Sequence, residues 1–119
     1  MSRYAALVQD AKSRIRQASV EEIKARIDNG DQFYLIDVRE QSEWERGRIP
    51  GANWLGRGIL ETQVERAIPD IDADIVLYCG AGGRSALAAD SLRQMGYTNV
   101  TSMDGGFGGW ARAGYPVQQ

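Results

Sequence analysis

The stretch that predicts the fold of this chain is DIVLYCGAGGRS, residues 74–85. Its first part, residues 74–78, is a short apolar segment typical of a buried strand. The residues that follow the stretch, 86–95, have the composition and spacing of a helix. Cys79, the only cysteine of the chain, therefore stands at the end of a strand, inside a glycine-rich turn that begins a helix.

This turn has the features of a site for an anion. Its glycines let the backbone curl without clashes from Cβ atoms. The first amides of a helix have no intrahelical partner, so they can donate to a bound anion. A helix N-terminus and a nearby arginine also favour the thiolate form of a cysteine. We predict that Cys79 is a nucleophile and that the substrate-binding residues are Gly80, Ala81, Gly82, Gly83, Arg84 and Ser85.

Both reactive side chains of the loop also have a structural interpretation. A lone cysteine commonly serves as a small buried hydrophobic residue, and the alternative for Arg84 is a pair with a carboxylate. An arginine at a helix N-terminus opposes the helix dipole, so its position is easier to understand if it serves an anion. The glycine turn and Arg84 together favour the nucleophile interpretation of Cys79.

The composition excludes several classes of function. A chain of 119 residues suits a single domain, and its formal net charge of −2 lacks the basic surplus of a nucleic-acid binder. The absence of histidine excludes a His-based triad and a His-ligated metal site, and a single cysteine excludes an intramolecular disulfide. No apolar run approaches the ~20 residues of a membrane span. We expect a cytoplasmic protein that uses no metal or cofactor and binds neither nucleic acid nor membrane.

Apolar segments and turn signals predict the order of the elements. Residues 3–15 form an amphipathic N-terminal helix packed on the domain, with a docking or dimer helix as the alternative. Ser19-Val20-Glu21-Glu22 is a capping box that begins a helix, which ends at Gly30. Further strands are expected at 33–38, 53–55 and 99–103, in addition to the one at 74–78. Further helices are expected at 41–46, from Ile59 to Pro69, at 86–95 and from 105 to about 114.

Because strands alternate with helices, the sheet should be mostly parallel, with about five strands and helices on both faces. Sites in such α/β sheets lie beyond the carboxyl ends of the strands. Asp37 ends one strand and Cys79 another, so Asp37, Arg39 and the loop share one rim if these strands are neighbours. We expect Asp37 and Arg39 to support the site as a charge-assisted pair.

The chain resembles a single-domain rhodanese, a sulfurtransferase of the thiosulfate:cyanide type. The resemblance covers about Arg16 to Pro116, which leaves residues 1–16 as an N-terminal helix and 17–119 as the domain. The motifs that carry it are Asp37-Val38-Arg39-Glu40, Gly47-Arg48-Ile49-Pro50-Gly51-Ala52, Tyr78-Cys79 with Gly82-Gly83-Arg84-Ser85, and Gly105-Gly106 before Trp110 and Pro116. One departure is Arg48, where the family usually has histidine.

The resemblance implies an α/β fold with a central parallel sheet and a persulfide on Cys79. It implies that the loop amides and Arg84 hold the sulfur and oxyanion groups of a donor such as thiosulfate, and that an acceptor such as cyanide or a protein partner takes the sulfur. Glu43 resembles a family position near the site and is interpreted as structural. Arg48 and Arg57 are expected to be surface charges, with a place at the mouth of the site as the alternative.

Two other functions remain open on the sequence. One is a non-catalytic persulfide carrier or interaction module, for which the N-terminal helix would be a partner surface. The other is a phosphatase or arsenate reductase, because relatives of this fold share a cradle between a cysteine and an arginine. Those loops have about five residues between the two, whereas this chain has four, Gly80 to Gly83, which predicts a smaller ring of amides.

Overall fold

The computed structural model describes residues 1–119. The five strands are β1 Arg16–Ser19, β2 Tyr34–Asp37, β3 Asn53–Trp54, β4 Ile75–Tyr78 and β5 Val100–Asp104. The helices are α1 Arg3–Lys12, α2 Val20–Asp28, α3 Gln41–Arg46, α4 Leu60–Ala67, α5 Gly83–Gln94 and α6 Gly106–Arg112. No helix is both long and apolar enough to span a bilayer.

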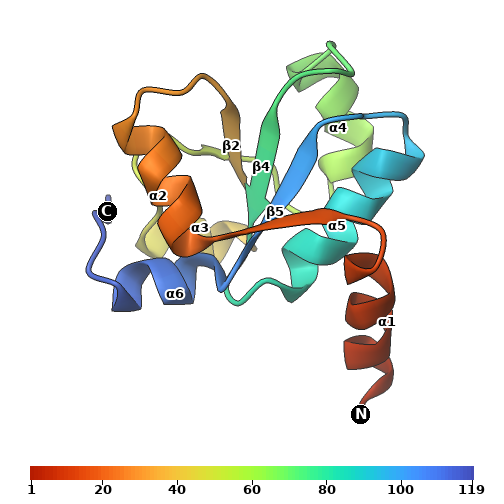
Figure 1. The fold of residues 1–119 in the computed structure, drawn as a ribbon, viewed down its shortest axis with the longest axis horizontal. Helices are drawn as coiled ribbons and strands as arrows, with labels where there is room; N and C mark the ends of the chain where they lie inside the picture. The colour runs from red at the N-terminus through yellow and green to blue at the C-terminus, as the bar shows by residue number, and fades with distance from the viewer.

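The sheet is parallel throughout, in the order β1-β5-β4-β2-β3. Figure 1 shows its three inner strands, β5, β4 and β2, side by side. β4 is the central strand, and all four of its side chains are buried because helices cover both faces. One core cluster joins the sheet to α4 and α5, and the second joins it to α2 and α6. The predicted α/β fold, with a parallel sheet of about five strands, is therefore confirmed.

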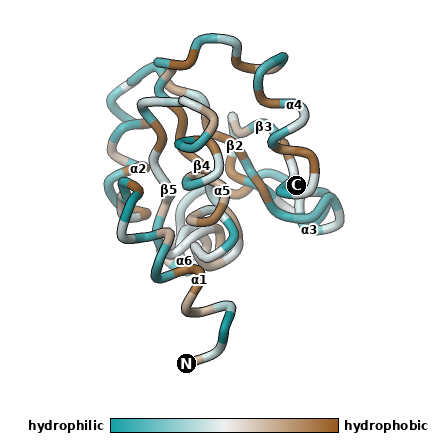
Figure 2. The backbone as a smooth tube through the Cα atoms, turned by 90° about the vertical axis from the view of Figure 1, so that its right-hand side faces the viewer, coloured by the Kyte–Doolittle hydropathy of each residue, from teal (hydrophilic) through white to brown (hydrophobic).

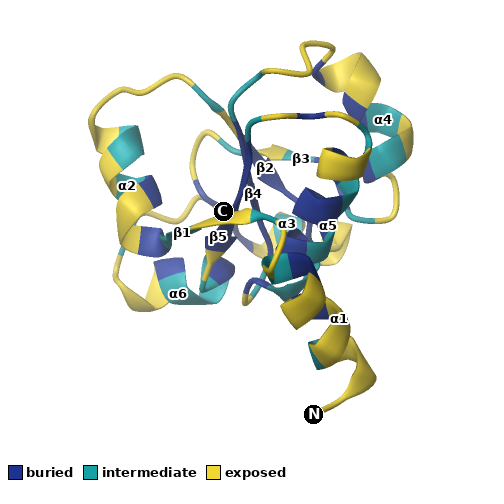
Figure 3. Cartoon of the chain, turned by 45° about the vertical axis from the view of Figure 1, so that its right-hand side comes forward, coloured by how far each residue is buried: buried dark blue, intermediate teal, exposed yellow.

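Burial and hydropathy follow these layers. In Figure 2 hydrophobic residues recur along β2, β4 and α5. Figure 3 shows the central strands buried and the outer sides of α1 and α2 exposed. Trp110 of α6 and Ile23 of α2 are almost completely buried on one side of the sheet, and Leu60 and Leu92 on the other. The helices α2 and α6 therefore cover one face of the sheet, and α4 and α5 cover the other.

Two features near the N-terminus differ from the sequence-based expectation. The helix α1 ends at Lys12 rather than near residue 15, because Ser13 caps it and Ile15 packs against the core. The strand β1 is absent from the expected elements, since three of its four residues, Arg-Gln-Ala-Ser, are polar and none is fully buried. It exists because the edge of β5 offers unpaired backbone groups, and Arg16 pairs there with Thr101.

The capping box at Ser19 is confirmed. The Ser19 hydroxyl accepts from the Glu22 amide at 3.0 Å, and the Glu22 carboxylate accepts from the Ser19 amide at 2.8 Å. The cap fixes the point at which β1 passes into α2, because both orphan amides are satisfied there.

Candidate active site

The carboxyl ends of β2 and β4 lie side by side. The two strands are parallel neighbours, and Asp37 stands opposite Tyr78 in the register. Cys79 follows Tyr78 directly, so the end of β2 and the glycine-rich loop meet at one rim of the sheet. This is the rim at which ligands bind in open parallel sheets.

The sulfur of Cys79 lies inside the loop and accepts several hydrogen bonds. The amides of Gly82 and Ser85 donate to Sγ at 3.1 and 3.3 Å. The Ser85 hydroxyl lies 3.5 Å from Sγ, and its other partners are the Gly82 carbonyl at 3.4 Å and the Ser102 hydroxyl at 2.8 Å. Cys79 is only 1% exposed, so the loop donors surround a sulfur that solvent barely reaches.

These donors change the acidity of the thiol. Burial alone would raise the pKa of Cys79, because it disfavours the charged form. The Ser85 hydroxyl and the amides of Ser85, Gly82 and Ala81 act in the opposite direction and outweigh burial, so the pKa of Cys79 is lowered. The loop therefore stabilises a thiolate, which is the nucleophilic form of cysteine.

The backbone of α6 holds the loop from outside. The amide of Phe107 donates to the carbonyl of Cys79 at 2.7 Å, and the amide of Gly108 donates to the carbonyl of Gly80 at 2.9 Å. A Cβ on Gly106 would lie 2.5 Å from the carbonyl oxygen of Cys79, so only glycine allows this approach. The carbonyls of Cys79 and Gly80 are thus bound by α6, while the amides of Gly82 and Ser85 face the sulfur.

The Arg84 side chain forms an ion pair with a carboxylate outside the loop. Its Nη1 and Nη2 donate to the two carboxylate oxygens of Glu43 in α3, at 2.7 and 3.2 Å. Its guanidinium lies over Gly80, where a Cβ would be 3.0 Å from Nη2. The hydrogen bonds from Arg84 are the main reason that the pKa of Glu43 is lowered. Sequence reasoning placed Glu43 near the site but not in this pair, since 41 residues separate the partners.

Asp37 and Arg39 form a buried pair behind the loop. Arg39 Nη2 donates to Asp37 Oδ2 at 2.7 Å and to the Gly47 carbonyl at 2.6 Å. The Arg39 guanidinium also lies 4.3 Å from the centre of the Phe107 ring. Because Arg39 bonds to the ends of β2 and α3 and contacts α6, the pair joins three elements around the loop.

Comparison with known proteins decides the family. The model of the rhodanese-like domain matches residues 19–113. The chain belongs to this family. A curated sulfurtransferase of Allochromatium vinosum is 33% identical over 103 residues, which covers 87% of this chain and 94% of that protein. Sulfur transfer in general is therefore the class of activity that its relatives support.

Two further proteins are similar to this rhodanese-like chain. A probable adenylyltransferase/sulfurtransferase MoeZ of Mycobacterium tuberculosis is 32% identical over 80% of this chain, but the match spans only 24% of that larger protein. A solved structure from Rhodopseudomonas palustris, of unknown function and described as a possible tyrosine phosphatase, is 32% identical with a TM-score of 0.91. It matches 99% of this chain and 96% of its own.

In this rhodanese-like chain, Arg48 and Arg57 bind partners away from the cysteine loop. Arg48 donates to the Trp44 carbonyl at 3.2 Å and lies over the Trp44 ring at 4.4 Å. Arg57 pairs with Glu61 at 2.7 Å and with the Ser91 hydroxyl at 3.2 Å. The polar groups of both side chains are thus directed to residues outside the loop.

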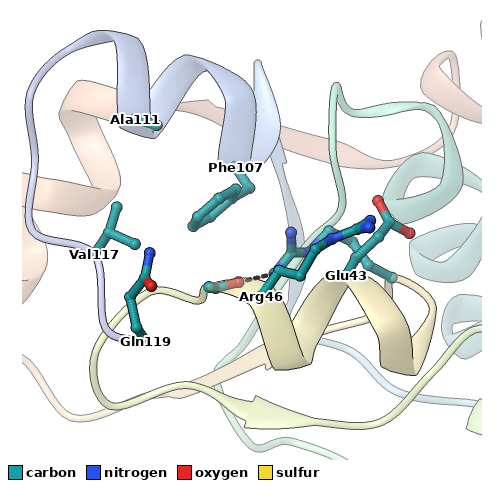
Figure 4. Close-up of a pocket in the computed structure, with 8 residues that line it drawn as sticks. Glu43, Arg46, Phe107, Ala111, Val117 and Gln119 are labelled. Atoms are coloured by element: carbon teal, nitrogen blue, oxygen red, sulfur yellow. Dashed lines mark hydrogen bonds between the residues drawn. The ribbon is translucent and has the colours of Figure 1, made fainter.

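An open cavity of about 290 Å³ lies between α3, α6 and the C-terminal residues of the chain (Figure 4). Its lining residues are Arg39, Glu43, Arg46, Gly47, Phe107, Ala111, Val117 and Gln119. None of them belongs to the cysteine loop, so this cavity shares Arg39 and Glu43 with the site but does not contain the nucleophile. The groups that contact the Cys79 sulfur are therefore those of the loop, not those of the cavity.

Proposed function

We propose that this rhodanese-like chain is a sulfurtransferase of the thiosulfate:cyanide type, which carries sulfur as a persulfide on Cys79. The observation that carries the proposal is the sulfur itself, which sits among the donors of Gly82 and Ser85 with a lowered pKa. Such a site suits a thiolate and equally suits a persulfide, since both are anions on sulfur.

The reaction would proceed in two displacement steps. The Cys79 thiolate attacks the outer sulfur of thiosulfate, a sulfur–sulfur bond forms, and sulfite leaves with the electron pair of the broken bond. A nucleophile such as cyanide then attacks the terminal sulfur and leaves as thiocyanate, which restores the thiolate. No proton is transferred in either step, so a chain without histidine needs no general base.

The loop amides and Arg84 are assigned to substrate. Arg84 uses two of its five N–H groups on Glu43, which leaves three for an anionic donor. Its side chain is 35% exposed beside Gly80, so a sulfonate group at the loop can reach it. Asp37 and Arg39 are assigned to support, because their mutual bonds hold the frame around the loop.

The phosphatase description of the Rhodopseudomonas palustris relative makes phosphate hydrolysis the alternative to weigh. The loop has four residues between Cys79 and Arg84, and the amides of Gly82 and Ser85 already donate to the sulfur. A tetrahedral phosphate would need a wider arc of donors, and each unpaired oxygen costs about 1–3 kcal/mol. We therefore favour sulfur over phosphate.

Mass spectrometry of the intact protein tests the proposal. Incubation with thiosulfate is expected to add the mass of one sulfur atom, and cyanide is expected to remove it. The Cys79→Ser variant should show neither change, because a serine hydroxyl is not ionised at neutral pH and forms no persulfide. Catalytic turnover with cyanide separates an enzyme from a persulfide carrier, and an aryl phosphate hydrolysed faster than sulfur is transferred would overturn the proposal.

A further inference from the structure

The helix α1 lies outside the residues that the family model matches, yet it borders the cysteine loop. In Figures 1 and 3 it runs past α5 and projects beyond the rim of the sheet, with its N-terminal end in solvent. Val8 and Ala11 are buried on the side of α1 that meets the domain. Arg14, just after α1, pairs with Asp90 of α5 at 2.9 Å. The helix is thus attached along α5, and its first turn lies next to the cysteine loop.

One side chain of α1, Tyr4, contacts the loop, and a second, Lys12, contacts a neighbour of the loop. The hydroxyl oxygen of Tyr4 lies directly against Gly83, and the Tyr4 ring carbon Cζ is 3.2 Å from the position of a Cβ there. Lys12 Nζ is 3.5 Å from Asp104 Oδ1, and this same carboxylate oxygen is 3.3 Å from the position of a Cβ on Gly82. The helix therefore borders Gly83 directly and Gly82 only through Asp104.

Gly83 leaves open the space that the Tyr4 side chain fills. It is the first residue of α5 and does not have the positive φ that demands glycine, in contrast to Gly82 with φ +114°. The three atoms nearest to a Cβ on Gly83 all belong to Tyr4, and the hydroxyl oxygen would overlap with it. Alanine would suit a helix better. A side chain at Gly83 would therefore displace the Tyr4 ring from its place on the loop.

Tyr4 also stands next to the groups that do the chemistry. Gly83 lies between Gly82 and Ser85, whose amides bind the Cys79 sulfur. Arg84 follows Gly83 directly, and the pKa of Arg84 is raised first by its hydrogen bonds with Glu43, which outweigh burial. Tyr4 is 52% exposed, so one side of it meets the loop and the other meets solvent.

We propose that Tyr4 is a specificity-determining residue: it forms one wall of the approach to Cys79 and restricts the size of the sulfur acceptor. The proposal rests on the sulfurtransferase function given above. On this proposal an acceptor passes Tyr4, which packs on Gly83 of the loop, before it reaches the almost fully buried Cys79. A compact anion such as cyanide passes this wall more readily than a bulky thiol such as glutathione.

Alkylation of Cys79 tests the wall without any sulfur transfer. The rates of reaction with iodoacetamide and with a fluorescein maleimide are measured on the wild type, Tyr4→Ala, Tyr4→Phe and Leu7→Ala. Leu7 is the matched control, because it is a large side chain on the same helix and is 60% exposed. In Tyr4→Ala the ratio of the maleimide rate to the iodoacetamide rate should rise about 10-fold, the order of discrimination that a missing group in a pocket gives. Tyr4→Phe and Leu7→Ala should keep the wild-type ratio.

The ratio of kcat/KM for glutathione to that for cyanide should rise in parallel with the alkylation ratio. An unchanged alkylation ratio in Tyr4→Ala, or an equal rise in Leu7→Ala, would overturn the inference. Should Tyr4→Ala fail to fold, Tyr4→Leu keeps an apolar side chain on the helix, shortens the wall, and should still raise the ratio. An altered alkylation ratio in a protein that transfers no sulfur would refute the proposed function and leave Tyr4 as the wall.

Discussion

Replacement of Ser85 by alanine tests how the loop makes its cysteine reactive. The Ser85 hydroxyl is 3.5 Å from Cys79 Sγ and 2.8 Å from the hydroxyl of Ser102. Ser85→Ala removes this hydroxyl, whereas the backbone amides of Gly82 and Ser85 remain at 3.1 and 3.3 Å from the sulfur. The pKa of Cys79 should therefore rise in the variant, because one of the groups that oppose the effect of burial is lost.

The size of the effect follows from the geometry. A hydrogen bond to a charged group contributes about 1.5–3 kcal/mol, and the long 3.5 Å contact argues for the lower end, about 1.5 kcal/mol, or a tenfold change in an equilibrium. Below the pKa of the thiol, the thiolate fraction and the alkylation rate should fall about tenfold. At alkaline pH, where the thiol is ionised in both proteins, the two rates should converge.

Stability changes separately from acidity. Ser102 is 1% exposed, so its hydroxyl loses a buried partner in Ser85→Ala, at a cost of about 1–3 kcal/mol. The double variant Ser85→Ala with Ser102→Ala removes both hydroxyls and should recover part of this stability without recovering the alkylation rate. Ser102→Ala alone is the control, because it leaves the Ser85 hydroxyl beside the sulfur.

The assay is the pH dependence of the rate at which iodoacetamide alkylates Cys79, with urea unfolding measured on the same samples. If Ser85→Ala gives the wild-type rate at every pH, the hydroxyl contributes nothing to the thiolate and the reasoning is refuted. If Ser102→Ala lowers the rate as much as Ser85→Ala does, the effect comes from disruption of the hydroxyl pair rather than from a donor to sulfur.

Three further predictions concern residues around the loop. Arg84→Ala should lower kcat/KM for thiosulfate about tenfold or more through the loss of a bond to a charged group. The double variant with Glu43→Gln should recover part of the lost kcat/KM. A fall in kcat/KM of less than about twofold in Arg84→Ala would make Arg84 a structural residue. Gly106→Ala should destabilise the fold in urea by about 1–3 kcal/mol more than Gly96→Ala, because both glycines have positive φ but only at Gly106 would a Cβ overlap with backbone atoms. The pKa of Asp90 is lowered to about 2, first by hydrogen bonds from Arg14, so this carboxylate stabilises the fold above its ordinary pKa and the effect is lost as the pH falls towards 2. Asp90→Asn should therefore lower the thermal midpoint at pH 7, and the difference from the wild type should shrink towards zero as the pH falls through about 2; an equal difference at pH 7 and below pH 2 would contradict the ion pair.

Much of the fold was predictable because it depends on short-range patterns. The apolar run at 75–78 predicts a buried strand, since all four side chains are covered by helices. The capping box at Ser19 predicts the start of α2, because its partner Glu22 is three residues away. The glycine turn after Cys79 predicts donors that face an anion, because the amides that begin a helix lie within one loop.

The sequence by itself therefore determined the strand, loop and helix around Cys79 and the mostly parallel direction of the strands. Only the tertiary structure decided what surrounds that loop. The Glu43 carboxylate on Arg84, the α6 amides on the loop carbonyls and the Tyr4 ring on Gly83 join residues far apart in the chain. The polar edge strand β1 likewise forms only because β5 presents an open edge. Local periodicity records which face of an element is buried, but it does not record which element covers that face, and this is set by the order of the strands and the packing of the helices.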